Sequence, residues 1–251
     1  MNWSISRILH GVKDDLLSFF FPPVCTGCGE KLRENESFFC SVCHDAFDSI
    51  PPPICPLCGA PLGNHVLETR KCPECPSGEV HFDSARSAFL YRGAIAEGVK
   101  AFKFRSRIEL SELFARILYY QIRKKMSGKK FDVIVPVPLH FRRYMQRGYN
   151  QAGEIARIIS RETYIDHFPD AIKRVRATKA QSGLHHDDRR ENVKNAFSPS
   201  PGDRLKNKKV LLIDDVYTTG STINACAGAI KKGGAESVTA LTICRALTLD
   251  A

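Results

Sequence analysis

The spacing of its cysteines is the strongest constraint on how this chain can fold. Eight of the ten cysteines lie between residues 25 and 75, and all eight belong to C-x-x-C pairs. Two thiolates three positions apart on a tight turn can bind one metal ion, and two such turns complete a tetrahedral zinc site. A disulfide framework would not repeat one short spacing four times. The segment is therefore predicted to hold two structural zinc ions.

Consecutive pairs are the simplest ligand sets, and interleaved pairs are the alternative. Consecutive pairing predicts one site of Cys25, Cys28, Cys40 and Cys43 and a second site of Cys55, Cys58, Cys72 and Cys75. Gly29 and Gly59 follow the second cysteine of a pair, where a positive φ turns backbone N–H groups toward sulfur. His44 and His65 are interpreted as surface residues, because eight thiolates already complete two sites. Metal-bound thiolates imply a reducing compartment, so we expect a cytoplasmic protein.

The composition favours an ordinary globular protein without a membrane span. Of the 251 residues, 43% are apolar and 25% are charged. No apolar run approaches the roughly 20 residues that a membrane-spanning helix needs. The first residues lack a signal-peptide cleavage site, and their helical apolar spacing predicts an amphipathic helix over 5–20. We expect this helix to pack on its own protein rather than on a membrane surface.

The pattern of the sequence changes after residue 80, which predicts two domains. We expect a helix and a double zinc module over 1–80 and a larger domain over 81–251, in which 81–130 forms a hood or connecting helices. Apolar runs in the larger domain predict strands over 86–93, 131–139, 171–176, 208–215 and 237–244. Helical spacing predicts helices over 94–104, 109–126, 150–160 and 223–232, with a basic loop over 140–149. Alternating strands and helices indicate an α/β fold with a largely parallel sheet covered on both faces.

The stretch VLLIDDVYTTGST, residues 210–222, combines a buried strand, two adjacent acids and a hydroxyl-rich turn. The strand is expected to end at Asp214 and Asp215, and the turn over 218–222 leads into a helix. Backbone N–H groups, the helix dipole and the hydroxyls of such a turn suit a phosphate dianion. Two carboxylates nearby can accept hydrogen bonds from ribose hydroxyls, and a divalent cation would relieve their repulsion. The predicted ligand is a ribose 5-phosphate with a charged group at C1.

This stretch closely resembles the phosphoribosyl pyrophosphate (PRPP) motif of type I phosphoribosyltransferases. Together with the cysteine-rich N-terminus, YRGAIAEGVKAFKF, PVPLHFRRYMQRGYNQA and RATKAQSGLHHDDRRENVKNAF, it makes the chain similar to the ComF family of competence-associated proteins. The resemblance covers nearly the whole chain. It implies a type I phosphoribosyltransferase-like sheet preceded by a double zinc ribbon.

The resemblance also implies residue roles. Asp214 and Asp215 would contact the ribose hydroxyls, and the 5-phosphate would bind to Thr218, Thr219, Gly220, Ser221 and Thr222. The turn containing Val137, Pro138 and Leu139 would form the pyrophosphate loop. The side chains expected to neutralise the leaving pyrophosphate are those of Arg142, Arg143 and Arg147, for which a purely solubilising surface role is the alternative. Mg²⁺ would accompany PRPP.

Two features of the sequence depart from the better-known members. Purine-salvage enzymes often carry an aspartate at the first position of the phosphate turn, where this chain has Thr218, which argues against a hypoxanthine or guanine acceptor. No general base is visible.

The acceptor site is expected to come from 84–130 or from the zinc module. A polar segment over 178–195, with Gln181, Arg189 and Asn192, corresponds to the mobile lid of such enzymes.

These features of the sequence are compatible with two functions. The first is a PRPP-binding phosphoribosyltransferase-type protein in DNA uptake or utilisation, which transfers phosphoribose to an unknown acceptor and works with competence-machinery proteins. The alternative is a single-stranded DNA-binding factor that uses the zinc ribbons and a basic patch, with a non-catalytic phosphoribosyl site. Residues 100–150 contain thirteen Lys or Arg and three acids. This excess of positive charge favours polyanionic partners. Aromatic residues among them, Phe102, Phe104, Tyr144 and Tyr149, fit either base stacking or the core.

Overall fold

The computed structural model describes residues 22–64, 71–176 and 195–247. The predicted N-terminal helix, His65 and the predicted lid residues Gln181, Arg189 and Asn192 lie outside these ranges. No helix within them is both long and apolar enough to cross a lipid bilayer.

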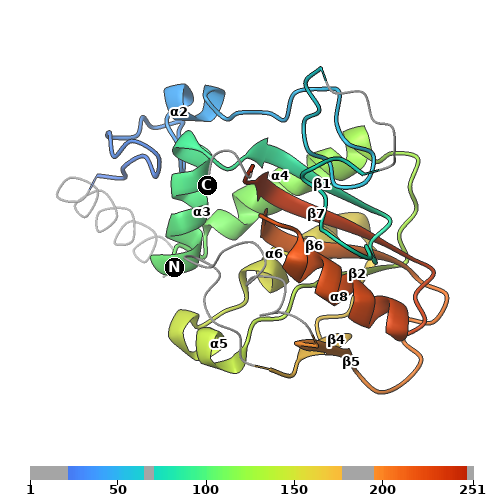
Figure 1. Ribbon diagram of the computed structural model, residues 1–251. Coiled ribbons are helices and arrows are strands. Elements are labelled where there is room, and N and C mark those ends of the chain that lie inside the picture. Colours follow the sequence, from blue (N-terminus) through green and yellow to red (C-terminus); the bar gives the residue numbers. More distant parts are fainter. Residues whose placement is uncertain (1–21, 65–70, 177–194, 248–251) are drawn as a thin grey trace, which may run out of the picture.

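The centre of the molecule is a five-stranded, fully parallel sheet in the order β1-β7-β6-β2-β3, of which β1, β7, β6 and β2 are labelled in Figure 1. Its strands are β1 (Ser84–Leu90), β2 (Val133–Pro136), β3 (Asp166–His167), β6 (Lys209–Tyr217) and β7 (Ser237–Arg245). The central strands are almost entirely buried, because helices cover both faces of the sheet. The predicted α/β fold class is confirmed.

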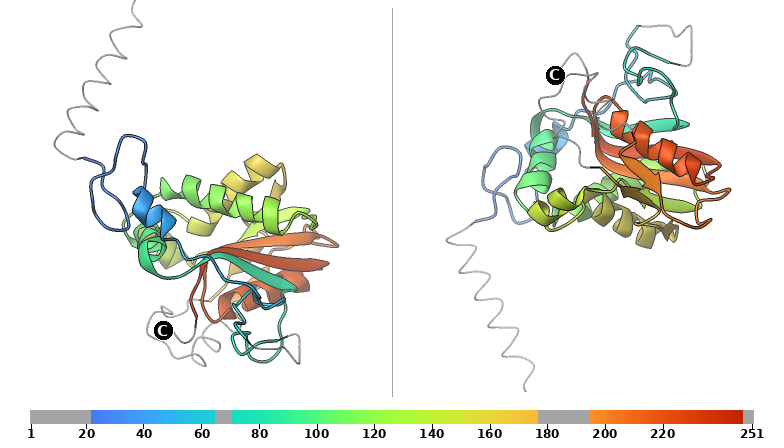
Figure 2. Two further views of the ribbon diagram at one scale, coloured as in Figure 1. Left: turned by 90° about the horizontal axis from the view of Figure 1, so that it is seen from above. Right: turned by 60° about the horizontal axis from the view of Figure 1, so that its bottom comes forward.

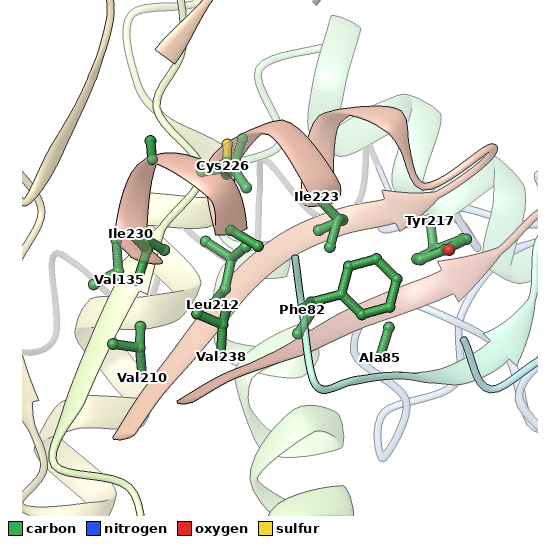
Figure 3. Close-up of a cluster of buried hydrophobic side chains, with 14 of the residues drawn as sticks. Phe82, Ala85, Val135, Val210, Leu212, Tyr217, Ile223, Cys226, Ile230 and Val238 are labelled. Carbon is green, nitrogen blue, oxygen red and sulfur yellow. The ribbon is translucent and has the colours of Figure 1, made fainter. Parts of the chain in front are cut away.

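Helices α4 (Leu110–Lys125) and α6 (Gln151–Thr163) cover one face, and α8 (Ser221–Lys232) covers the other (Figure 2, left). Successive residues of β6 alternate between the two layers. Leu211 lies in the α4–α6 core, whereas Leu212 packs in the α8 core with Ile230 (Figure 3). Helix α3 (Gly93–Phe104) follows β1 and contributes to the α4–α6 core.

The two cysteine segments pack on opposite faces of the sheet. Cys25, with Leu32 and Phe39, belongs to the α4–α6 core, and the short helix α2 (Ser41–Asp45) contacts α3. The second cysteine segment belongs to the α8 core and includes Cys55. The predicted boundary after residue 80 stays a prediction, since this segment shares its core with the sheet.

The structure corrects three local expectations. The predicted basic loop contains a helix, α5 (Phe141–Arg147). Strand β6 does not end at the two acids but continues to Tyr217, because β7 pairs with it over its whole length. The strand expected over 171–176, β4 (Ile172–Arg174), lies outside the parallel sheet and pairs in antiparallel fashion with β5 (Phe197–Pro199).

Candidate functional site

The carboxyl ends of β2 and β6 meet where the sheet reverses its winding direction. From β2 the chain first runs to β3 on one side, and it later returns to β6 on the other. The ladder between the two strands ends at Pro136 and Ile213, and the Val137 N–H donates to the Ile213 carbonyl at 2.9 Å. Ligands of open α/β sheets bind in a crevice at this kind of position.

A cavity of about 560 Å³ lies at this edge of the sheet. It brings together most of the residues predicted from the sequence, namely Val137, Pro138, Leu139, Arg143, Arg147, Asp214, Asp215, Thr218, Gly220 and Thr222. Thr219 and Ser221 are not part of the lining, and their hydroxyls bond to one another at 2.8 Å. The backbone of Arg142 lies in α5, and its side chain is outside the described part of the structure.

The turn after β6 has a geometry that only glycine accommodates. Gly220 has a φ of +74° and precedes the first residue of α8. A Cβ atom at this position would lie 2.2 Å from the Tyr217 hydroxyl oxygen and 2.9 Å from Pro76 Cγ. The backbone therefore packs directly on these two side chains. The first N–H groups of α8, which have no intrahelical partners, begin at this turn beside the cavity.

The two acids are adjacent on β6, and one of them pairs with a lysine of α3. The Asp215 N–H donates to Asp214 Oδ1 at 2.9 Å, and Lys103 Nζ of α3 lies 2.7 Å from Asp215 Oδ1. Burial and the neighbouring Asp215 charge raise the pKa of Asp214 to about 7, against the lowering effect of Lys103. A ligand that donates hydrogen bonds, or a cation, would relieve the repulsion within the ionised pair.

Lys103 is a site residue that the sequence pattern placed elsewhere. Its position among Arg105 and Arg107 suggested a basic surface patch, but its ammonium group reaches the cavity. Nothing in the local pattern of α3 indicates this, because the partner carboxylate lies more than a hundred residues away. Arg105 and Arg107 are not among the cavity-lining residues.

Gln151 and Arg174 are two further lining residues that were not predicted from the sequence. Gln151, the first residue of α6, is 1% exposed, and its Oε1 accepts a hydrogen bond from Arg147 at 3.1 Å. Its Nε2 has no partner among the described residues. Burial lowers the pKa of both Arg147 and Arg174. The motif RGYNQA was visible in the sequence, but no spacing rule assigns an amide to a cavity.

The side of the cavity formed by α3 and the residues that flank it contains Tyr91, Lys103, Phe104 and Ser106. These residues come from the 84–130 region, where an acceptor site was expected. The Arg147 guanidinium lies 5.1 Å from the centre of the Phe104 ring. Among the described lining residues, the only carboxyl groups are those of Asp214 and Asp215, and none is a histidine.

The four aromatic residues of the basic region fall into two groups. Phe102 and Tyr149 are buried in the core, and the Tyr149 hydroxyl donates to the Phe102 carbonyl. Phe104 is 72% exposed and Tyr144 is 48% exposed. Of these four, Phe104 and Tyr144 therefore present ring surface to solvent.

The eight predicted metal ligands form two groups of four, each made of two consecutive C-x-x-C pairs. Within each group the four Sγ atoms lie within 4.8 Å of one another. Interleaved pairing is thereby excluded. The Cys40 N–H points at Cys25 Sγ at 3.3 Å and the Cys72 N–H at Cys75 Sγ at 3.4 Å, as in thiolate sites whose charge is shared with the backbone. Four thiolates in each group fit a tetrahedral zinc ion.

Both the cysteine-rich part and the α/β part of the chain match known protein families. Residues 16–76 match the double zinc ribbon domain family, and residues 108–249 match the phosphoribosyl transferase domain family. Competence protein F of Haemophilus influenzae is 33% identical over 90% of this chain and 99% of its own length. DNA utilization protein YhgH of Escherichia coli K12 is 29% identical over 90% of this chain and 98% of its own length. Competence protein ComFC of Bacillus subtilis is 29% identical over 85% of this chain and 87% of its own length. The chain therefore belongs to the ComF family, in which a double zinc ribbon precedes a phosphoribosyl transferase domain.

Proposed function

We propose that this protein binds PRPP with Mg²⁺ and acts in DNA uptake or utilisation. The observation that carries the proposal is the single cavity that joins the Asp214–Asp215 pair, the turn over 218–222 and the turn over 137–139. The relatives named for competence and DNA utilization support the biological setting. The eight thiolates suit the reducing cytoplasm, where we expect the protein to act with other competence proteins.

Each part of the cavity matches one part of PRPP. The carboxylates of Asp214 and Asp215 accept hydrogen bonds from the ribose hydroxyls. The N–H groups of the 218–222 turn and the hydroxyls of Thr218 and Thr222, which line the cavity, donate to the 5-phosphate. The pyrophosphate lies against the 137–139 turn, where Arg143 and Arg147 neutralise its charge. Mg²⁺, when bound, supplies further charge neutralisation to the pyrophosphate and the acidic pair.

Catalytic transfer would rest on electrostatics. Departure of pyrophosphate leaves positive charge on C1 of the ribose, and the acidic pair stabilises that charge while the arginines stabilise the leaving group. The acceptor enters between Tyr91, Phe104 and the ribose. An acceptor that is already deprotonated needs no general base, in keeping with the described lining residues, which offer none beyond the acidic pair.

Calorimetry with PRPP and Mg²⁺ tests the binding site. We expect one saturable site per chain, because the cavity accommodates one sugar phosphate. Pyrophosphate release measured with a panel of nucleobases and other nitrogen nucleophiles then separates a catalyst from a binding protein. Absence of PRPP binding at millimolar concentration, with zinc fully bound, would refute the proposal.

A second function, single-stranded DNA binding, is supported by the surface of α5. Phe141 and Met145 are exposed beside Tyr144, and Arg143 lies on the same helix. Exposed rings among arginines form stacking platforms for bases, and the cations hold the phosphates. This surface adjoins the cavity, because Arg143 and Arg147 line it.

Binding of a single-stranded oligonucleotide is expected to weaken about 5-fold or more in Tyr144→Ala, since base stacking contributes about 1–3 kcal/mol. The wild-type affinity should also fall steeply with salt. Fluorescence anisotropy measures both effects. Tyr120→Ala, which removes an exposed tyrosine of α4, is the matched control. Equal losses in the two variants would exclude α5 as the binding surface.

A further inference from the structure

Arg245, the last residue of β7, ties the second cysteine cluster to the sheet. Its side chain is fully buried. Nη1 donates to the Cys58 carbonyl at 2.7 Å, and Nη2 lies 3.5 Å from Cys58 Sγ. Nη2 also donates to the Glu74 carbonyl at 3.3 Å and lies 3.9 Å from its carboxylate. The partners of this buried charge therefore come from both halves of the cluster.

The same guanidinium lies against the strand that leads into the phosphate turn. It sits 4.3 Å from the centre of the Tyr217 ring, directly across the β6–β7 ladder. Tyr217 is buried beside Phe82 and Ile223 at the start of α8 (Figure 3). Its hydroxyl packs directly on Gly220, since even a single Cβ atom at that position would clash with it.

The cluster also reaches the turn by a second route. Pro76 follows the metal ligand Cys75 directly, and its ring packs against Gly220. Two contacts thus link the second cluster to one glycine of the turn. The first cluster has no comparable connection within the described residues: it packs on α3, where Cys43 Sγ and Ala94 surround Gly27.

We propose that the second zinc cluster is the support that holds the phosphate turn in its binding geometry, with Arg245 as the positioning residue between them. The inference deepens the proposed function, on which its affinity measurement rests. Binding of a sugar 5-phosphate then depends on an ordered second cluster far more than on the first.

The physical reason lies in the partners that a buried guanidinium needs. Removing a partner from a buried charge is strongly destabilising. A bound metal ion holds the Cys55–Cys58 and Cys72–Cys75 turns together, and so fixes the Cys58 and Glu74 acceptors in place. If these turns separate, Arg245 loses acceptors, Tyr217 loses the cation over its ring, and Pro76 leaves Gly220. The N–H groups of the turn then lose the fixed geometry that a phosphate requires.

The test compares Arg245→Met and Arg245→Lys with Arg86→Met. Arg86 is the matched control, because its guanidinium also donates to a carbonyl of the same ribbon, that of Pro56, whereas its contacts within the described residues do not include Tyr217 or the 218–222 turn. With two zinc ions bound per chain in every variant, we expect the affinity for ribose 5-phosphate to fall about 10-fold or more in both Arg245 variants. It should stay within about 2-fold of wild type in Arg86→Met.

Hydrogen–deuterium exchange of the peptide over 218–222 provides a readout that needs no ligand. Exchange should be faster in both Arg245 variants than in Arg86→Met, and Arg245→Lys covers the case in which Arg245→Met fails to fold. Equal exchange and equal affinity across the Arg245 and Arg86 variants would overturn the inference. A wild-type protein whose turn is protected but which binds neither ribose 5-phosphate nor PRPP would instead refute the proposed function.

Discussion

Replacing both Asp214 and Asp215 with asparagine is expected to weaken PRPP binding by about 100-fold or more. An ionised acceptor contributes about 1.5–3 kcal/mol per hydrogen bond, and the double variant removes the charge from two of them. The loss of two negative charges also weakens Mg²⁺ binding, so the effect should grow with Mg²⁺ concentration. Calorimetry measures the PRPP affinity and its dependence on the Mg²⁺ concentration.

The single variant Asp214→Asn adds a signature that distinguishes a binding residue from a structural one. The folded pKa of about 7 lies above the ordinary carboxyl pKa of 3.8, so the ionised carboxyl destabilises the folded state. In the wild type, stability should therefore fall as the pH rises from about 4 through 7, and then level off. Asp214→Asn should lack that decrease and unfold at a higher temperature than the wild type at pH 8.

Asp203→Asn is the control for both measurements, because Asp203 is exposed and its carboxylate lies 3.9 Å from the Lys206 ammonium group, at the surface. Its PRPP affinity and its pH–stability curve should match those of the wild type. If the double asparagine variant bound PRPP with unchanged affinity, the acidic pair would have no part in the site.

The second large effect concerns the metal sites. Cys55→Ser is expected to release one zinc ion and to lower the free energy of unfolding by at least about 3 kcal/mol, since structural zinc contributes far more than this to folding. For a chain of this size, that loss corresponds to a decrease of roughly 10 °C in the midpoint of thermal unfolding. Cys55 is fully buried, and its cluster shares the α8 core with Val210 and Leu212.

Cys28→Ser tests the other cluster with the same chemical change. Cys28 is exposed, and only Cys25 of its group is buried. We expect the loss of one zinc ion with a smaller decrease in the midpoint. Elemental analysis and calorimetric unfolding measure the two quantities. A Cys55→Ser protein that kept two zinc ions and its wild-type midpoint would contradict the four-cysteine assignment.

Much of the fold could be predicted because it depends on local patterns. Val210 to Ile213 form a continuous apolar run, which indicates a strand buried on both faces. Helix α8 begins and ends within two residues of its predicted limits, since a glycine-containing turn precedes it and Gly233 follows it. The predicted end of β6 was wrong, because pairing with β7 extends the strand beyond the acids.

The candidate site likewise has a part that the sequence predicted and a part that it did not. Asp214, Asp215 and the 218–222 turn belong to one contiguous motif, and the sequence alone brought them together. Lys103 and Gln151 come from other elements, and their local sequences carry no spacing that indicates a cavity. Helix α5 was missed because FRRYMQR is short and strongly basic, and such a segment has no core-facing apolar pattern.

The sequence by itself determined the four C-x-x-C pairs that supply the metal ligands and the strand–turn–helix that carries the acids. Both depend on residues a few positions apart, whose relative placement the local backbone controls. Only the tertiary structure decided that Lys103 neutralises Asp215 and that Arg245 joins Cys58 to Tyr217. These pairs are assembled by the order of strands in the sheet, and the packing of distant segments, rather than spacing along the chain, creates them.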